Sequence, residues 1–112
     1  MGKRDELIEK YQGEMKKLGI SYDANLFEKV VIGCGPSIYN ADAETVSGTD
    51  SAELATVKNN FLIKKLGLAD SGDLDKAIDA TVEKMGRSNR NKYRAIFYYL
   101  LTVHFKKESV YK

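Results

Sequence analysis

Hydrophobic residues recur three and four positions apart along most of the chain, and the strict alternation of a half-buried strand is not found. In residues 3–18 this spacing places Leu7, Tyr11 and Met15 on one side of a helix. Four later segments repeat the spacing. The pattern predicts an all-α fold, a single domain over residues 1–112, with about five helices over residues 3–18, 24–32, 51–66, 73–85 and 89–106.

The last predicted helix is the most hydrophobic one. Residues 93–105 are apolar nearly all round, and such a helix is normally buried on several sides. We therefore expect it at the centre of the fold, with the shorter helices around it and Ser88 as its N-cap.

Capping residues and glycines bound the other helices. Asp50 and Glu53 fit a capping box, in which Asp50 caps the third helix and Glu53 reaches back to the cap. Gly19, Gly67 and Gly86 each follow a helix as a C-terminal stop. Residues 37–49 form the least regular stretch, in which a short helical turn is expected over residues 42–46.

Charge and composition exclude several classes of protein. One cysteine excludes an internal disulfide and suits a reducing compartment. The charged start of the chain is unlike a signal peptide, and no apolar run reaches the roughly 20 residues that span a bilayer. We therefore expect a cytoplasmic protein that does not enter the membrane. The net charge of +2 divides into −4 over residues 1–56 and +6 over residues 57–112, so the two halves can attract each other within the chain or between copies.

The stretch VVIGCGPSIYN, residues 30–40, imitates a dinucleotide-binding loop. That motif needs a preceding strand, a following helix and a third glycine, and Ile38 stands in the third position. Gly33, Gly35 and Pro36 fit the end of a helix better. The stretch predicts a helix stop, and no cofactor is expected.

An enzyme is the weaker alternative because the sequence offers few candidate catalytic residues. Cys34 is a nucleophile only if a base stands beside it, and the chain has a single histidine, His104. A lone cysteine more often acts as a small buried hydrophobe.

Residues 42–53 have acids at positions 1, 3, 9 and 12 of a calcium-binding loop. Val46 takes a ligand position, and Ser47 stands where the sharp turn needs glycine. No metal site is predicted.

The segment GRSNRNKYR, residues 86–94, gathers cations at the expected start of the last helix. Arginines beside free backbone N–H groups would bind an anion. The alternative is a solvated helix start whose cations pair with Asp75, Asp79 and Glu83 of the fourth helix.

These observations favour a non-catalytic binding or protein-interaction module over an enzyme. We expect a protein partner or a small anionic ligand, and a dimer stays open. Tyr93, Tyr98 and Tyr99 accompany the cations, but aromatic residues at helical spacing are typical of a core, so nucleic acid is disfavoured. The ligand-binding residues predicted at the two chain reversals are Ser37, Tyr39, Asn40, Arg87, Asn89, Arg90 and Arg94.

Four stretches together, KRDELIEKY, GPSIYNADAETVSG, VKNNFLIKKLGL and SNRNKYRAIFYYLL, resemble a small bacterial family, domain of unknown function 2853. The resemblance covers nearly the whole chain. It implies a compact all-helical fold, and it carries no catalytic residue, cofactor or substrate to this sequence.

Overall fold

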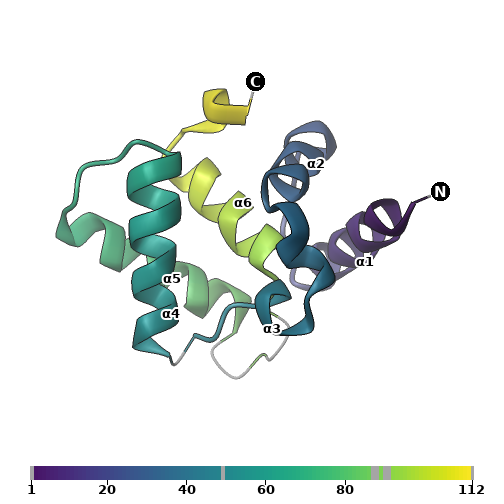
Figure 1. Cartoon of the computed structure of the whole chain (residues 1–112), viewed down its shortest axis with the longest axis horizontal. Helices are drawn as coiled ribbons and strands as arrows, with labels where there is room; N and C mark the ends of the chain where they lie inside the picture. The colour runs from purple at the N-terminus through teal and green to yellow at the C-terminus, as the bar shows by residue number, and fades with distance from the viewer. Residues whose placement is uncertain (1, 49, 87–88, 90–91, 112) are drawn as a thin grey trace.

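The computed structural model describes residues 2–48, 50–86, 89 and 92–111, with residues 41 and 42 described by their backbone alone. Over these residues the chain is all-α, with one isolated β-bridge, Thr45 to Tyr93, and no strand (Figure 1). The elements are α1 (Lys3–Lys17), α2 (Ala24–Gly33), the 3₁₀ helix η1 (Gly35–Tyr39), α3 (Ala41–Glu44), α4 (Ser51–Thr56), the π-helix η2 (Val57–Lys65), α5 (Gly72–Met85), α6 (Arg94–His104) and the 3₁₀ helix η3 (Glu108–Tyr111).

Helix α6 lies at the centre, as its hydrophobicity predicts, and it packs against α1, α2, α3 and α5 (Figure 1). Ile96, Phe97 and Leu101 are completely buried within it. Burial of this kind is the main stabilising contribution in a domain of this size. The C-terminal end of α6 differs, because Val103 there keeps 40% of its surface exposed.

The ends of the short helices follow from their capping residues. The Asp23 carboxylate accepts hydrogen bonds from the backbone N–H groups of Asn25 and Leu26, at 2.9 and 3.2 Å, and so begins α2. Asp50 accepts from Ala52 and Glu53 in the same way and begins α4. Gly86 ends α5 with a φ of 93°, a conformation that suits glycine.

The predicted start of the last helix is wrong. Helix α6 begins at Arg94 with Tyr93 as its N-cap, and the predicted cap, Ser88, lies outside the described residues. The reason is a tertiary contact: the N–H of Val46 donates to the carbonyl of Lys92 at 2.8 Å, next to the bridge between Thr45 and Tyr93. This pairing holds the chain extended just before the helix. The aliphatic stem of Lys92 lies close to Gly48, and only 4% of the Lys92 surface is exposed.

Two further details differ from the sequence predictions. The third helix is divided into α4 and the wider η2, where each backbone bond spans one more residue than in an α-helix. The Glu53 side chain does not serve as a capping-box partner, because it forms an ion pair with Arg94 of α6. In the stretch expected to be least regular, residues 37–49, the short helical turn expected over residues 42–46 corresponds to α3 at Ala41–Glu44.

After α6 the chain folds back over its own end. Lys106 has a φ of 56°, the left-handed conformation that stops a helix, and the Lys107 N–H donates to the carbonyl of Thr102 at 2.9 Å. Helix η3 then packs against α2. The Tyr111 ring lies so close to Gly33 that a Cβ at Gly33 would stand 3.0 Å from it. Glycine at this position therefore lets the C-terminal segment, residues 105–111, approach α2.

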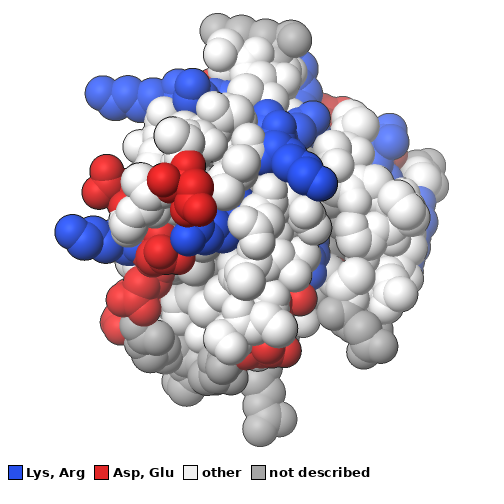
Figure 2. All heavy atoms as spheres, turned by 60° about the vertical axis from the view of Figure 1, so that its left-hand side comes forward, with Lys and Arg blue, Asp and Glu red and all other residues white. Residues whose placement is uncertain are grey.

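Charged side chains are unevenly spread over the described surface. Figure 2 shows acidic side chains gathered at one edge of a face that is uncharged over much of its area. Among the described helices, none is both long and apolar enough to cross a bilayer.

Candidate functional site

The stretch that imitates a dinucleotide loop is the end of a helix, as predicted. Residues 30–33 are the last turn of α2, and Gly35 adopts a φ of 63° at the turn into η1. The described residues contain no strand that could precede a phosphate-binding loop.

The residues predicted to bind a ligand in this stretch have different surroundings. The Ser37 hydroxyl donates to the backbone carbonyl of Cys34, and the backbone N–H of Asn40 donates to the carbonyl of Ser37 at 3.2 Å. Tyr39 is 52% exposed. Tyr39 and Asn40 are both exposed, Ser37 is partly buried, and a ligand at this segment stays a prediction.

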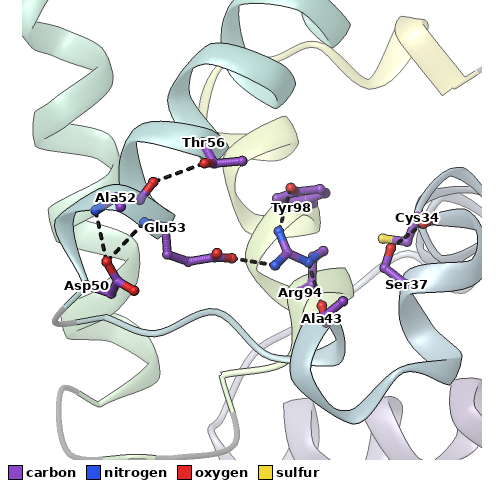
Figure 3. A network of polar contacts seen from close by, with 9 residues as sticks. All are labelled: Cys34, Ser37, Ala43, Asp50, Ala52, Glu53, Thr56, Arg94 and Tyr98. Atoms are coloured by element: carbon purple, nitrogen blue, oxygen red, sulfur yellow. Dashed lines mark hydrogen bonds and ion pairs between the residues drawn. The ribbon is translucent and has the colours of Figure 1, made fainter.

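Arg94 is at the centre of a polar network inside the molecule (Figure 3). Its Nε donates to the carbonyl of Ala43 at 2.6 Å, one terminal nitrogen donates to the hydroxyl of Tyr98 at 2.9 Å, and the other pairs with Glu53. These contacts join α6 to α3 and α4. The pKa of Arg94 is raised, because Tyr98 and Glu53 together outweigh the opposing effect of burial.

A second polar cluster lies near the first. The Tyr11 hydroxyl donates to a carboxylate oxygen of Glu44 at 2.6 Å, and Lys10 pairs with the same oxygen at 3.0 Å. Burial, followed by the contact with Glu44, raises the pKa of Tyr11 well above its usual range. These bonds attach α1 to α3.

The other residues of the basic segment are described only in part. The side-chain amide of Asn89 donates to the carbonyl of Met85 at 2.9 Å, at the end of α5. Arg87 and Arg90 lie outside the described residues, so an anion site there, and a cleft shared with residues 35–40, stay predictions. Of the acids expected to pair with this segment, Asp75 instead pairs with Lys58 at 3.2 Å.

The tyrosines considered for nucleic-acid stacking pack against other rings within the fold. Tyr98 stacks on Phe61 with 3.9 Å between ring centroids, and Tyr93 lies 4.8 Å from Tyr11. Tyr99 packs edge-on against Phe27.

Cys34 has the character of a half-buried thiol. Burial raises the pKa of Cys34 to about 11, although the Arg94 guanidinium lowers it in part. At neutral pH the thiol therefore stays protonated and weakly nucleophilic. His104 lies on the exposed end of α6 with its ring edge-on to Phe105.

No cluster of three metal-ligating side chains occurs among the described residues. Glu53, the twelfth position of the calcium-like stretch, forms an ion pair with Arg94.

The hollow that sequence reasoning missed lies between α2, the end of α6 and η3. This C-terminal cavity has a volume of about 470 Å³. Its lining residues are Asp23, Asn25, Leu26, Lys29, Tyr99, Val103, Glu108 and Tyr111.

The walls of the C-terminal cavity are held by contacts of their own. The Tyr99 hydroxyl accepts a hydrogen bond from the Asp23 N–H at 2.8 Å, which ties α6 to the start of α2. Tyr111 packs against Gly33 on one side, and the Lys65 ammonium lies 5.2 Å from its ring centroid. The cavity therefore has fixed aromatic walls from α6 and from the C-terminal segment.

With this geometry established, comparison with known families identifies the chain. A family model described as "Protein of unknown function (DUF2853)" matches residues 10–109. The chain belongs to this family. None of the curated proteins matches it. Membership of DUF2853 confirms the resemblance seen in the sequence, and it assigns no activity.

The match to DUF2853 includes all the cavity-lining residues except Tyr111. Two sequence signals could have pointed to this cavity. Lys29 interrupts the apolar run of α2 beside Leu26, and an aromatic residue, Tyr111, follows the last helix after a break. Neither signal reveals that the two segments meet, because that depends on how the chain turns at Lys106.

Proposed function

We propose that this DUF2853 protein is a small non-catalytic binding module of the cytoplasm, and that it holds an amphipathic small molecule in the C-terminal cavity. The observation that carries the proposal is the convergence of polar and aromatic side chains from α2, α6 and η3 on one hollow of about 470 Å³. This volume falls within the range of about 300–1,000 Å³ that small-molecule sites occupy.

The apolar part of the lining favours a ligand with a hydrophobic or aromatic body. Leu26 and Val103 contribute aliphatic surface, and Tyr99 and Tyr111 contribute rings. Val103 is one of the few large hydrophobic side chains left exposed in the described chain. A ligand that covers Val103 would remove apolar surface from water, which favours binding.

The polar part of the lining favours a ligand with two polar groups. The Lys29 ammonium suits an acidic group, and this agrees with the anionic ligand expected from the sequence. Glu108 suits a hydrogen-bond donor. The Asp23 carboxylate already accepts the two N–H groups that begin α2. The ligand class proposed is therefore a hydrophobic acid that also carries a hydroxyl or amine.

Ligand-observed NMR with a library of small aromatic and aliphatic acids tests the proposal. Val103→Trp should fill the cavity and abolish binding of the compounds that bind the parent protein. Thr56→Trp is the matched control, because Thr56 is exposed on α4 outside the cavity, and it should leave binding unchanged. Lys29→Ala should weaken the binding of the acids more than the binding of the corresponding amides.

A library in which no compound binds the parent protein would overturn the proposal. Binding that survives Val103→Trp unchanged would overturn it as well, because the compounds would then occupy another surface.

A further inference from the structure

We propose that the groove between α4, η2 and α5 is a docking surface for a basic amphipathic helix of a partner protein. The groove has a volume of about 370 Å³ and shares no lining residue with the C-terminal cavity, so this inference stands apart from the proposed function. Its lining residues are Ser51, Leu54, Ala55, Lys58, Asn59, Asp75, Ile78 and Asp79.

The groove combines an apolar floor with an acidic rim. Leu54, Ala55 and Ile78 supply the floor. Asp75 and Asp79 stand on the α5 side, and Asp70 lies next to them through its bond to Lys58. Two of these carboxylates, those of Asp70 and Asp75, bond to the single ammonium of Lys58. Figure 2, turned to bring the α4, η2 and α5 side of the molecule forward, shows acidic side chains at one edge of this side, with basic side chains among them.

The contacts of Lys58 indicate how a basic side chain of a partner would bind in the groove. Its ammonium bonds to Asp70 at 3.1 Å and to Asp75 at 3.2 Å, and its side chain is only 21% exposed. The aliphatic stem of a lysine therefore lies along the groove while its charge meets the rim. A lysine or arginine of a partner would use the same two kinds of contact.

The shape of the groove favours a helix as the occupant. The lining positions on α4 and η2 are 51, 54, 55, 58 and 59, which form one face over roughly 12 Å of helix axis. The groove is bordered by helices, whose backbone groups are bonded internally, so an extended strand would find no edge to pair with. A helix needs only side-chain anchors three and four residues apart, with cations beside them. Complementary charge of this kind fixes the orientation of a partner and speeds its association.

Fluorescence anisotropy with a labelled synthetic helix of leucine and lysine tests the proposal, and the same design with glutamate in place of lysine is the control probe. The lysine probe should bind the full chain with an affinity that falls as salt increases, and the glutamate probe should not bind. Asp75→Asn with Asp79→Asn should weaken binding about tenfold. Asp5→Asn with Glu9→Gln is the matched control, since both acids are exposed on α1, and it should leave the affinity within about twofold.

Two variants separate this groove from general attraction to acidic surfaces. Ala55→Trp leaves the charge unchanged and blocks the floor, so it should abolish binding. Lys58→Ala removes the internal competitor and should tighten binding severalfold. Because Ala55 is exposed, the parent melting temperature should be kept, and circular dichroism checks this. Failure of the lysine probe to bind at low salt, equal weakening by the α1 control, or full binding by Ala55→Trp would each overturn the proposal.

Discussion

The two ends of α6 differ in how their polar groups are used. At the N-terminal end, Arg94 directs its guanidinium to Glu53, Tyr98 and the carbonyl of Ala43, all within the molecule (Figure 3). At the C-terminal end, Val103 is exposed and borders the C-terminal cavity. The N-terminal end of α6 is thus bonded to α3 and α4, whereas its C-terminal end borders the C-terminal cavity.

Arg94 shows that a cation within a charge run can stabilise the fold. The sequence predicts an anion site from the cations of residues 86–94, yet the guanidinium of Arg94 bonds to α3 and α4. A hollow depends on where neighbouring elements fail to cover a helix. At the end of α6, η3 turns toward α2 and leaves part of the α6 surface uncovered.

The largest expected difference in stability is between substitutions in the core of α6 and at its exposed C-terminal end. Phe97 is completely buried, so Phe97→Ala should lower the free energy of unfolding by about 3–5 kcal/mol, through lost burial and the cavity that remains. Val103→Ala should cost less than about 1 kcal/mol, because Val103 is partly exposed. Urea denaturation of both variants measures the contrast. Equal losses would mean that α6 is not buried as described.

The polar network at the start of α6 should contribute less to the free energy of unfolding than the core does. Arg94→Ala leaves Glu53 without its partner and should lower the free energy of unfolding by about 2 kcal/mol. Arg4→Ala, an exposed arginine on α1, is the control and should change stability by less than about 0.5 kcal/mol. A double-mutant cycle with Glu53→Gln measures the coupling directly. Additive losses would show that the two side chains act independently.

The contact between α2 and the C-terminal segment should contribute still less to the free energy of unfolding than the polar network does. Gly33→Ala places a Cβ against the Tyr111 ring and should cost roughly 1 kcal/mol in the parent protein. In a Tyr111→Ala background the same substitution should become neutral or stabilising, because alanine favours the helix and nothing opposes it. Thermal or urea unfolding of the four proteins checks this. An equal loss of stability in both backgrounds would show that the Tyr111 ring does not cause the cost of Gly33→Ala.

The effect on stability that is smallest at neutral pH concerns the Cys34 thiol. Because burial raises its pKa from about 9 to about 11, the folded protein holds this proton more tightly than the unfolded chain does. The resulting stabilisation is complete below about pH 9 and is lost as pH rises toward 11. Cys34→Ser should reduce this alkaline loss of stability. At pH 7 iodoacetamide should modify Cys34 about 100-fold more slowly in the folded protein than after unfolding, and equal rates would contradict the buried thiol.

Local patterns predicted most of the helices because local interactions determine them. Asp23 and Asp50 cap α2 and α4 as expected, and the apolar run of α6 marks the centre of the fold. The start of α6 was mispredicted because a pairing between residues 45–46 and 92–93, which no local pattern contains, keeps the chain extended. Glu53 was assigned to a cap for the same reason, since its partner lies 41 positions away.

The candidate site was less predictable than the fold. Its parts come from α2, from α6 and from residues after Lys106, and each part alone resembles ordinary helix surface. Only the left-handed turn at Lys106 and the glycine at position 33 bring Tyr111 to α2. Neither residue carries functional chemistry that a motif could have marked.

Mapping of backbone amide shifts by two-dimensional NMR, with the library acids that bind the parent protein, tests the central claim most directly. The account predicts that the largest shifts fall on Leu26, Lys29, Val103 and Tyr111, around the C-terminal cavity. Shifts concentrated instead on Arg87, Arg90 and Arg94 would contradict it, because the start of the last helix would then be the ligand site.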